Sequence, residues 1–420
     1  MLKVKNLLNK NNILLGLAVL IKFLAVLFGL LINRWVNTYL SPETLKEYNL
    51  ITSYTPIILG FIIFGIPTLI QKNYTNINDK EKLKDVWATF FYLRMASYFI
   101  GLVIIIFTFR LSRTNDLMLI LGIFTTQFIL LADLNYRSVC DVLNQTWKFS
   151  ITDVLGKILL VLGIYSAVFF RVPMEGILIF IYSSIFSYLF AYMLDYFWNK
   201  KNTEMGKFSL EILKENYKPI LYLSFSSLFF FGSVDKQLLD FYGVSAFELN
   251  GYTNAFKVFD IALIIPSMVI PVFASRAKKH FDITNEKHER IKILERWLIL
   301  TFLVGLLISF CVFIFSRIIF DLIDPKSIYT DSSLKVMPLF CVSLFCYFSS
   351  FFYYNINVFF HKEKQETIIQ ILNSISFVSL YVLLIPNFGI VGAAMGHMCI
   401  YLLDFIRRTI NFTINKNNFL

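Results

Sequence analysis

The chain has 420 residues, of which 57% are hydrophobic and only 16% are charged, and its mean hydropathy is +0.65. Soluble proteins carry about 25% charged residues, and a chain of this length could not hide so much apolar surface from water. The composition therefore excludes a soluble fold. The net charge of +11 does not indicate nucleic-acid binding here, because basic residues commonly flank membrane spans.

Twelve apolar runs follow one another along the chain, and each is long enough to cross a lipid bilayer as a helix. They lie at about 12–33, 49–70, 86–109, 116–134, 149–170, 174–196, 219–241, 251–273, 297–320, 334–359, 367–386 and 389–411. We read the first run as an uncleaved span, because it is too long for the apolar part of a signal peptide. The sequence predicts an all-α integral membrane protein with about twelve transmembrane helices.

Lysine and arginine set the predicted orientation. Most of those outside the spans fall in segments on the side of the N-terminus, such as 71–85, 197–218 and 274–296. Because cytoplasmic segments are enriched in basic residues, both termini are predicted to be cytoplasmic.

The chain also carries signs of an internal duplication. Ser41 and Tyr48, just before the second span, recur at one constant spacing as Ser245, before the eighth span, and Tyr252, at its start. The motif Pro-x-x-Gly-Ile joins the fifth and sixth spans at 173–177 and the last two at 386–390. We therefore predict two six-helix lobes related by a parallel repeat. The predicted boundaries are 1–200 for the N-terminal lobe, 201–217 for a cytoplasmic linker and 218–420 for the C-terminal lobe.

Charges inside spans are costly in lipid, so they mark candidate functional positions. The candidate cations of a central cavity are Lys22, Lys157, Lys236 and Lys257. The candidate ion-coupling carboxylates are Asp153, Asp235 and Asp260. Local neutralisation is an equal alternative for the pairs Asp153–Lys157, Lys236–Asp240 and Lys257–Asp260, because these residues share a helix face. Arg94 ranks below the lysines, because its side chain is long enough to reach the inner surface.

Other chemistry has little support. The five cysteines are scattered, and neither they nor the four histidines have metal-site spacing. We therefore expect no metal and no cofactor, with a proton or sodium ion as the coupling species. The predicted outer segments are short, which argues against an enzyme such as a membrane glycan polymerase or glycosyltransferase.

The segment Pro386–Ala394 resembles the Pro-x-Tyr/Phe-Gly-Ile-x-Gly-Ala-Ala signature of polysaccharide-unit flippases of the Wzx type. Two further segments resemble family motifs: Ser233–Asp240 with Asn250–Lys257, and the Leu-Ser-Pro-Glu hairpin at 40–43. Ser41 and Glu47 stand where glycine is usual, so this end of the chain diverges from the family. The superfamily includes MATE exporters and lipid II flippases, which implies a MATE-like fold.

The resemblance implies a flippase that moves an undecaprenyl-diphosphate-linked oligosaccharide from the inner to the outer leaflet by alternating access. It implies the bacterial cytoplasmic (inner) membrane, in the biosynthesis of O-antigen, lipopolysaccharide or capsule. The expected partners are the lipid-linked oligosaccharide, membrane lipids and other glycan-assembly proteins. The main alternative is a MATE-like, ion-coupled exporter of small molecules or drugs, which would use embedded acids rather than lysines.

Overall fold

The computed structural model is all-helical throughout the residues that it describes. These residues are 10–63, 66, 69–70, 79–112, 117–143, 145–172, 174–218, 220, 234–284, 286–359 and 363–415. Seven of the described helices are long and apolar enough to cross a membrane. The last of these, Gln365–Ile414, contains two of the predicted spans. Of the predicted span at 219–241, the structure describes mainly the final turns, so this span is not tested along its length.

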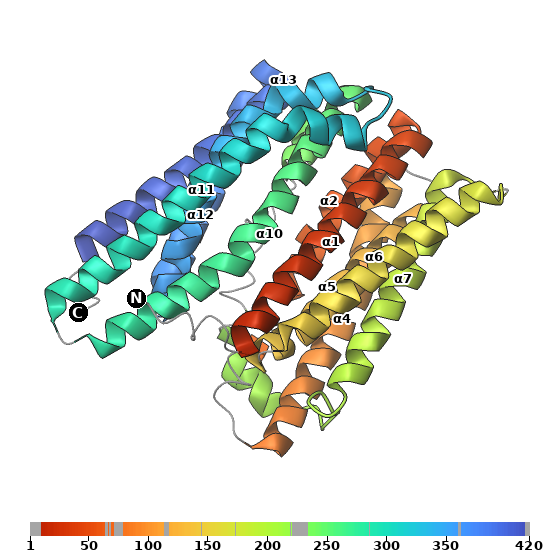
Figure 1. Ribbon diagram of the computed structural model, residues 1–420. Helices are drawn as coiled ribbons and strands as arrows, with labels where there is room; N and C mark the ends of the chain where they lie inside the picture. The colour runs from red at the N-terminus through yellow and green to blue at the C-terminus, as the bar shows by residue number, and fades with distance from the viewer. Residues whose placement is uncertain are drawn as a thin grey trace. The chain divides into compact units, whose positions relative to one another are not determined.

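By their internal contacts, the residues fall into two compact units, Met1–Ser233 and Val234–Leu420. The first unit contains α1 (Lys10–Tyr39), α2 (Pro42–Ile63), α4 (Lys80–Ser112), α5 (Leu117–Val142), α6 (Thr146–Phe169) and α7 (Gly176–Asn199) (Figure 1). The second contains α9 (Val234–Phe241), α10 (Ala246–Ile283), α11 (Lys287–Ile323), α12 (Thr330–Phe359) and α13 (Glu363–Asn415). The predicted lobe boundaries remain a prediction.

In the first unit, α6 packs against α1 and α7, while α5 packs against α2, α4 and α7. Part of the core lies where the rings of Trp87 and Tyr136 meet at 5.0 Å. Residues from the segment that the sequence assigns to a linker join this unit. The Ser209 amide donates to Thr89 Oγ1 at 3.0 Å, and the Lys207 amide donates to Asp85 Oδ1 at 2.6 Å. The segment is therefore fixed along the beginning of α4.

In the second unit, α12 is central and packs against α10, α11 and α13, and the short helix α9 packs against α13 and α10. Most of the long window of α12 is buried, whereas α11 exposes a wide apolar face. A helix that is apolar all round and buried belongs to the interior of a bundle, and an apolar exposed helix suits contact with lipid. Several polar side chains of α12 accordingly lie in the interior of the unit: Ser333, Ser343, Ser349, Ser350 and Asn357.

Helix α13 is a hairpin without a loop. Gly389 has φ 54° and ψ −130°, close to the first central residue of a type II′ turn, which glycine adopts without strain. Beyond it the chain runs back along itself. A Cβ at Gly392 would lie 2.2 Å from the Leu384 carbonyl oxygen, and one at Gly396 would lie 2.6 Å from the Tyr381 ring. The chain therefore reverses at Gly389, and Gly392 and Gly396 let the two halves of α13 pack closely.

One corner of the predicted repeat is also confirmed. The hydroxyl of Ser41 accepts from the Thr44 amide at 3.2 Å, and that of Ser245 accepts from the Glu248 amide at 3.3 Å. Both serines cap the helix that follows, α2 in one unit and α10 in the other. Four residues further on, Leu45 and Leu249 are both fully buried. The two units thus begin these helices in the same way.

The other predicted corner is not equivalent in backbone geometry. The left-handed residue before α7 is Arg171, with φ 49°, whereas the turn within α13 is made at Gly389 itself. Gly176 instead lets α7 approach α1, because a Cβ there would meet the Tyr39 carbonyl oxygen at 3.3 Å. Pro173 lies outside the described residues. The shared Pro-x-x-Gly-Ile motif therefore serves two different local structures.

Candidate functional site

Four of the predicted site residues come together where α9 meets α10. We call Asp235, Lys236, Lys257 and Asp260 the α9–α10 charge cluster. Asp235 is fully buried, and its carboxylate accepts from the Lys236 amide at 2.8 Å and from the Tyr252 hydroxyl. The Tyr252 ring packs against Phe340 of α12 at 5.5 Å, which holds its hydroxyl in place. Two hydrogen bonds within the protein thus satisfy the buried Asp235 carboxylate in place of water.

Lys236 is the cluster's most buried cation, with 8% of the residue exposed. Its ammonium lies 4.4 Å from the centre of the Phe256 ring, within the range of a cation–π contact. Lys236 also interacts electrostatically with half-buried Lys257 and exposed Asp260. An aromatic face attracts a cation but itself offers no oxygen or nitrogen acceptor to the N–H donors. The ammonium therefore retains capacity to bind an anion.

His397 lies next to this cluster and is 3% exposed. Its ring contacts those of Phe259, Phe340 and Tyr401 at 4.9, 5.1 and 4.8 Å. Its Nδ1 pairs with the Ser343 hydroxyl at 3.3 Å. His397 also interacts electrostatically with Lys236. The α9–α10 charge cluster therefore borders a group of aromatic rings in the interior of the unit.

From His397, rings in contact lead along α12. Tyr401 meets Tyr347 at 5.7 Å, Tyr347 stacks on Phe351 at 5.3 Å, and Phe351 stacks on Tyr354 at 5.9 Å. The guanidinium of Arg408 lies 5.8 Å from the Tyr354 ring centre. A continuous series of aromatic rings thus joins a buried lysine to a buried arginine within one unit.

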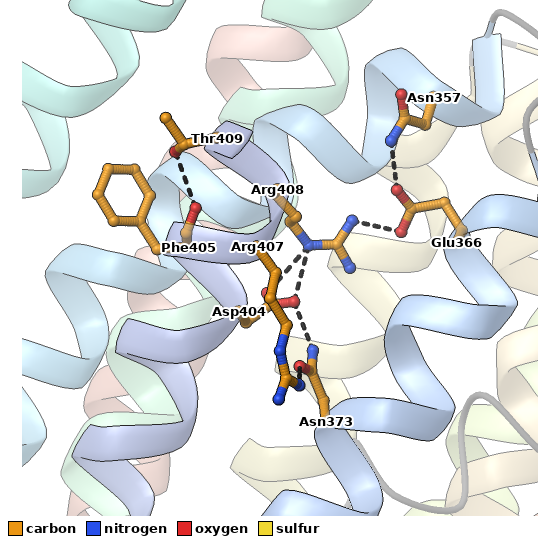
Figure 2. A network of polar contacts seen from close by, with 8 residues as sticks. All are labelled: Asn357, Glu366, Asn373, Asp404, Phe405, Arg407, Arg408 and Thr409. Atoms are coloured by element: carbon orange, nitrogen blue, oxygen red, sulfur yellow. Dashed lines mark hydrogen bonds and ion pairs between the residues drawn. The ribbon is translucent and has the colours of Figure 1, made fainter. Parts of the chain in front are cut away.

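A second buried group of charges surrounds Arg408 (Figure 2). We call it the Arg408 network, and it comprises Asn357, Glu366, Asn373, Asp404, Arg407 and Arg408. Arg408 is 1% exposed, and its Nε donates to both carboxylate oxygens of Asp404 at 2.9 and 3.0 Å. Its Nη1 reaches Glu366 on the opposite side (Figure 2). The expected pairing of Asp404 with a nearby basic residue is confirmed.

Neutral side chains complete the Arg408 network. Asn357 donates to Glu366 and Asn373 donates to Asp404, so each carboxylate has an amide partner as well as the arginine. Arg407 donates to Asn373 Oδ1 at 2.6 Å and to Ser376 at 2.9 Å. The network ties the end of α12 to both halves of α13. Asn357, which the sequence suggested for a sugar-binding cavity, is used within it.

In the first unit, Asp153 and Lys157 form the predicted ion pair along α6, with 3.4 Å between the ammonium and carboxylate. About a fifth of each side chain is exposed. The predicted local ion pair is therefore confirmed. A transport role for Asp153 and Lys157 remains a prediction. Lys22 lies in α1, but its side chain is outside the described residues.

Arg94 does not extend to the membrane surface. It is 2% exposed on α4, and its Nη1 donates to the Leu131 carbonyl of α5. It interacts electrostatically with Asp133 and Tyr192. Length alone allowed the side chain to reach either the surface or the interior, and the carbonyl and carboxylate on the neighbouring helix stabilise the buried position.

Sequence reasoning missed His397 and most of the Arg408 network. The histidines were considered only as metal ligands, and His397 is held by rings instead. Asp404 and Arg408 stand four residues apart on an apolar helix, which is a signal for a paired charge. Glu366 carried no such local signal, because its partner is 42 residues away.

No protein-family profile matches the chain, and no curated protein matches it. Solved structures of transporters do match the chain. The outward-facing conformation of a multidrug resistance MATE family transporter of the MOP superfamily aligns with a TM-score of 0.70 at 14% identity, over 97% of this chain and 95% of that one. A eukaryotic MATE transporter gives a TM-score of 0.70 at 10% identity, over 96% and 95%.

A MOP superfamily transporter from Pyrococcus furiosus gives a TM-score of 0.65 at 14% identity, over 99% of both chains. Its description assigns its binding pocket a reverse polarity, suggesting a different function. At these identities the likeness establishes the fold. The chain therefore has the MATE-type, all-helical architecture along almost its whole length, as predicted.

Proposed function

We propose that the chain is a membrane transporter rather than an enzyme, and that its substrate is a lipid-linked oligosaccharide with an anionic diphosphate head. The observation that carries this proposal is Lys236, an almost buried ammonium on an aromatic face, in a chain with a transporter fold. A charged residue at the bilayer centre costs about 2.5–3.5 kcal/mol on insertion scales, so an embedded lysine is a functional candidate. Diphosphate oxygens would accept hydrogen bonds from this ammonium.

The remaining predicted cations fit the same role. Lys257 lies within electrostatic reach of Lys236, so both lysines of the α9–α10 charge cluster are proposed to bind the same anionic head. Lys22 and Lys157 are proposed to add cations from the other unit, and the resemblance at Pro386–Ala394 supports a polysaccharide-unit substrate. Asp153, Asp235 and Asp260 are proposed to bind the coupling proton or sodium ion. The proposed setting is the bacterial inner membrane, beside other glycan-assembly proteins.

A second candidate is an ion-coupled exporter of small molecules. Two observations favour it. The solved structures of similar fold include multidrug resistance transporters, and the α9–α10 charge cluster contains two carboxylates that could attract a cationic compound. The two candidates differ in the charge of the substrate, and hence in whether the lysines or the aspartates are essential.

The test is to delete the gene in its host and to follow lipid-linked oligosaccharide and surface glycan. The proposal expects surface glycan to disappear and the lipid-linked unit to accumulate on the inner leaflet. Restoring the wild-type gene should reverse both effects. Lys236→Ala, Lys257→Ala and Lys22→Ala, produced at wild-type level, should fail to restore export, and Lys326→Ala, from an exposed turn, should restore it.

Normal surface glycan in the deletion strain would contradict the flippase. The exporter predicts instead that deletion raises sensitivity to cationic compounds, and that Asp260→Asn abolishes resistance while Lys236→Ala spares it. Full glycan export by all three lysine variants would reject the cationic site while keeping the flippase.

A further inference from the structure

A small cavity lies inside the first unit, between α2, α5 and α7. Its polar lining consists of Tyr48, Thr126, Gln127, Ser184 and Tyr188. The volume open to the centre of a water molecule is about 30 Å³. No residue of the proposed transport site lines it. The cavity is therefore a separate feature of the first unit.

The polar side chains reach the cavity at one level of the bundle. Tyr48 comes in the second turn of α2, which begins at Pro42, and Gln127 and Ser184 come in the third turn of α5 and α7, which begin at Leu117 and Gly176. All three side chains line the same cavity. Three helices thus direct polar groups to the same place.

Ser184 gives the cavity its chemical character. It is 1% exposed, and within the described part of the chain its hydroxyl has no hydrogen-bond partner. Its neighbours are satisfied: Thr126 donates to the Gly122 carbonyl at 2.8 Å, and Ser187 donates to the Ser184 carbonyl at 3.0 Å. A buried hydroxyl left without a partner is destabilising, because it has lost its hydrogen bonds to water. The lining therefore favours an occupant that can hydrogen-bond to Ser184.

The size of the cavity decides the class of occupant. One water molecule needs at least about 10–15 Å³ of such volume and two to four polar partners, both of which this cavity offers. Pockets for drug-sized ligands are about 300–1,000 Å³, so neither a sugar nor a drug fits in a space this small. An apolar cavity of this kind would stay dry, but here five polar side chains line it.

We propose that this cavity is a water-binding site, holding one or two molecules that bond to the Ser184 hydroxyl, the Gln127 amide and the hydroxyls of Tyr48 and Tyr188. The polar side chains that line the cavity include no ion pair. The bound water therefore links α2, α5 and α7 through hydrogen bonds. It supplies the partner that the Ser184 hydroxyl lacks among the described residues. The site is distinct from the charge clusters proposed for transport.

The direct test is an experimental density map of the full-length protein in lipid nanodiscs, at a resolution that shows ordered water. One or two peaks within hydrogen-bond distance of Ser184 Oγ are expected. A map with ordered water elsewhere in the protein and none in this cavity would overturn the proposal.

The sign of a mutational effect provides a second, independent test. If water satisfies Ser184, then Ser184→Ala removes a hydrogen bond and lowers the thermal midpoint of the purified protein. In a dry cavity the same change removes an unpaired hydroxyl, and the midpoint stays the same or rises, which would contradict the proposal. Ser187→Ala is the matched control: this hydroxyl lies one turn further along α7 and bonds only within its own helix. The small decrease in the thermal midpoint caused by Ser187→Ala should be the same whether or not the cavity holds water.

Discussion

Two neighbouring arginines near the end of α13 have different surroundings. Arg408 is 1% exposed and meets the carboxylates of Glu366 and Asp404. Arg407 is half-buried, and it donates hydrogen bonds to the neutral side chains of Asn373 and Ser376. A buried ion pair adds little net stability, but removing one member leaves an uncompensated charge. The consequences of losing the two arginines should therefore differ greatly.

We predict that Arg408→Leu destabilises the second unit by about 3–5 kcal/mol, because Glu366 and Asp404 lose their shared cation. The measurement is the shift in unfolding of the purified protein in mild detergent. Arg407→Leu, as the matched control, should cost about 1–3 kcal/mol, because it breaks hydrogen bonds without stranding a charge.

The double variant Arg408→Leu with Glu366→Leu provides the internal check. It should be more stable than Arg408→Leu alone, because one of the two stranded carboxylates is gone. Equal or lower stability of the double variant would show that Glu366 is not held by Arg408.

The turn within α13 depends on a single residue, which leads to a second prediction. Gly389→Ala should destabilise the hairpin by about 1–3 kcal/mol, because alanine is strained at φ 54°, ψ −130° although no atom blocks a Cβ there. Gly29→Ala is the control: it also meets no atom within 4 Å, but it lies within helix α1. This control should be neutral or stabilising, and thermal unfolding of both variants measures the difference.

The matching serine caps lead to a third prediction. Ser41→Ala and Ser245→Ala should each destabilise the protein by about 0.5–2 kcal/mol, because each removes the acceptor of a backbone amide in the first turn of a helix. Replacement by threonine or aspartate should retain most of the stability. If only one serine matters, the correspondence between α2 and α10 does not extend to energetics.

The elements show which features a sequence can predict. The turn at Gly389 depends on residues within a few positions, so the Pro-x-x-Gly-Ile motif was sufficient to locate the junction of the last two spans. The same Pro-x-x-Gly-Ile pattern did not reveal that Arg171 adopts the left-handed conformation before α7. The contact of Lys236 with Phe256 was also not predicted, because a pair at spacing four, Lys236–Asp240, was the simpler expectation. Such contacts depend on how the helices pack against one another. The spacing of residues along one helix does not reveal that packing.

At the scale of the whole molecule, the predicted all-helical, MATE-type fold is confirmed, and the orientation in the membrane remains a prediction. Basic residues concentrate in the segments assigned to the cytoplasm, which places both ends of the chain there. We therefore expect a fluorescent protein fused after Leu420 to fluoresce, and alkaline phosphatase fused there to be inactive. Fusions within 326–329, between α11 and α12, should give the reverse pattern. Active phosphatase at the C-terminus would contradict the predicted topology.

The hairpin in α13 has a consequence for how this chain can change over evolution. Gly392 lies against the Leu384 carbonyl and Gly396 against the Tyr381 ring, with only the turn at Gly389 between the two contacts. One inserted or deleted residue would rotate one half by about 100° against the other and bring a side chain to where only glycine fits. Any homologue that retains this hairpin should therefore align with the chain without a gap from 381 to 396, even where overall identity is very low.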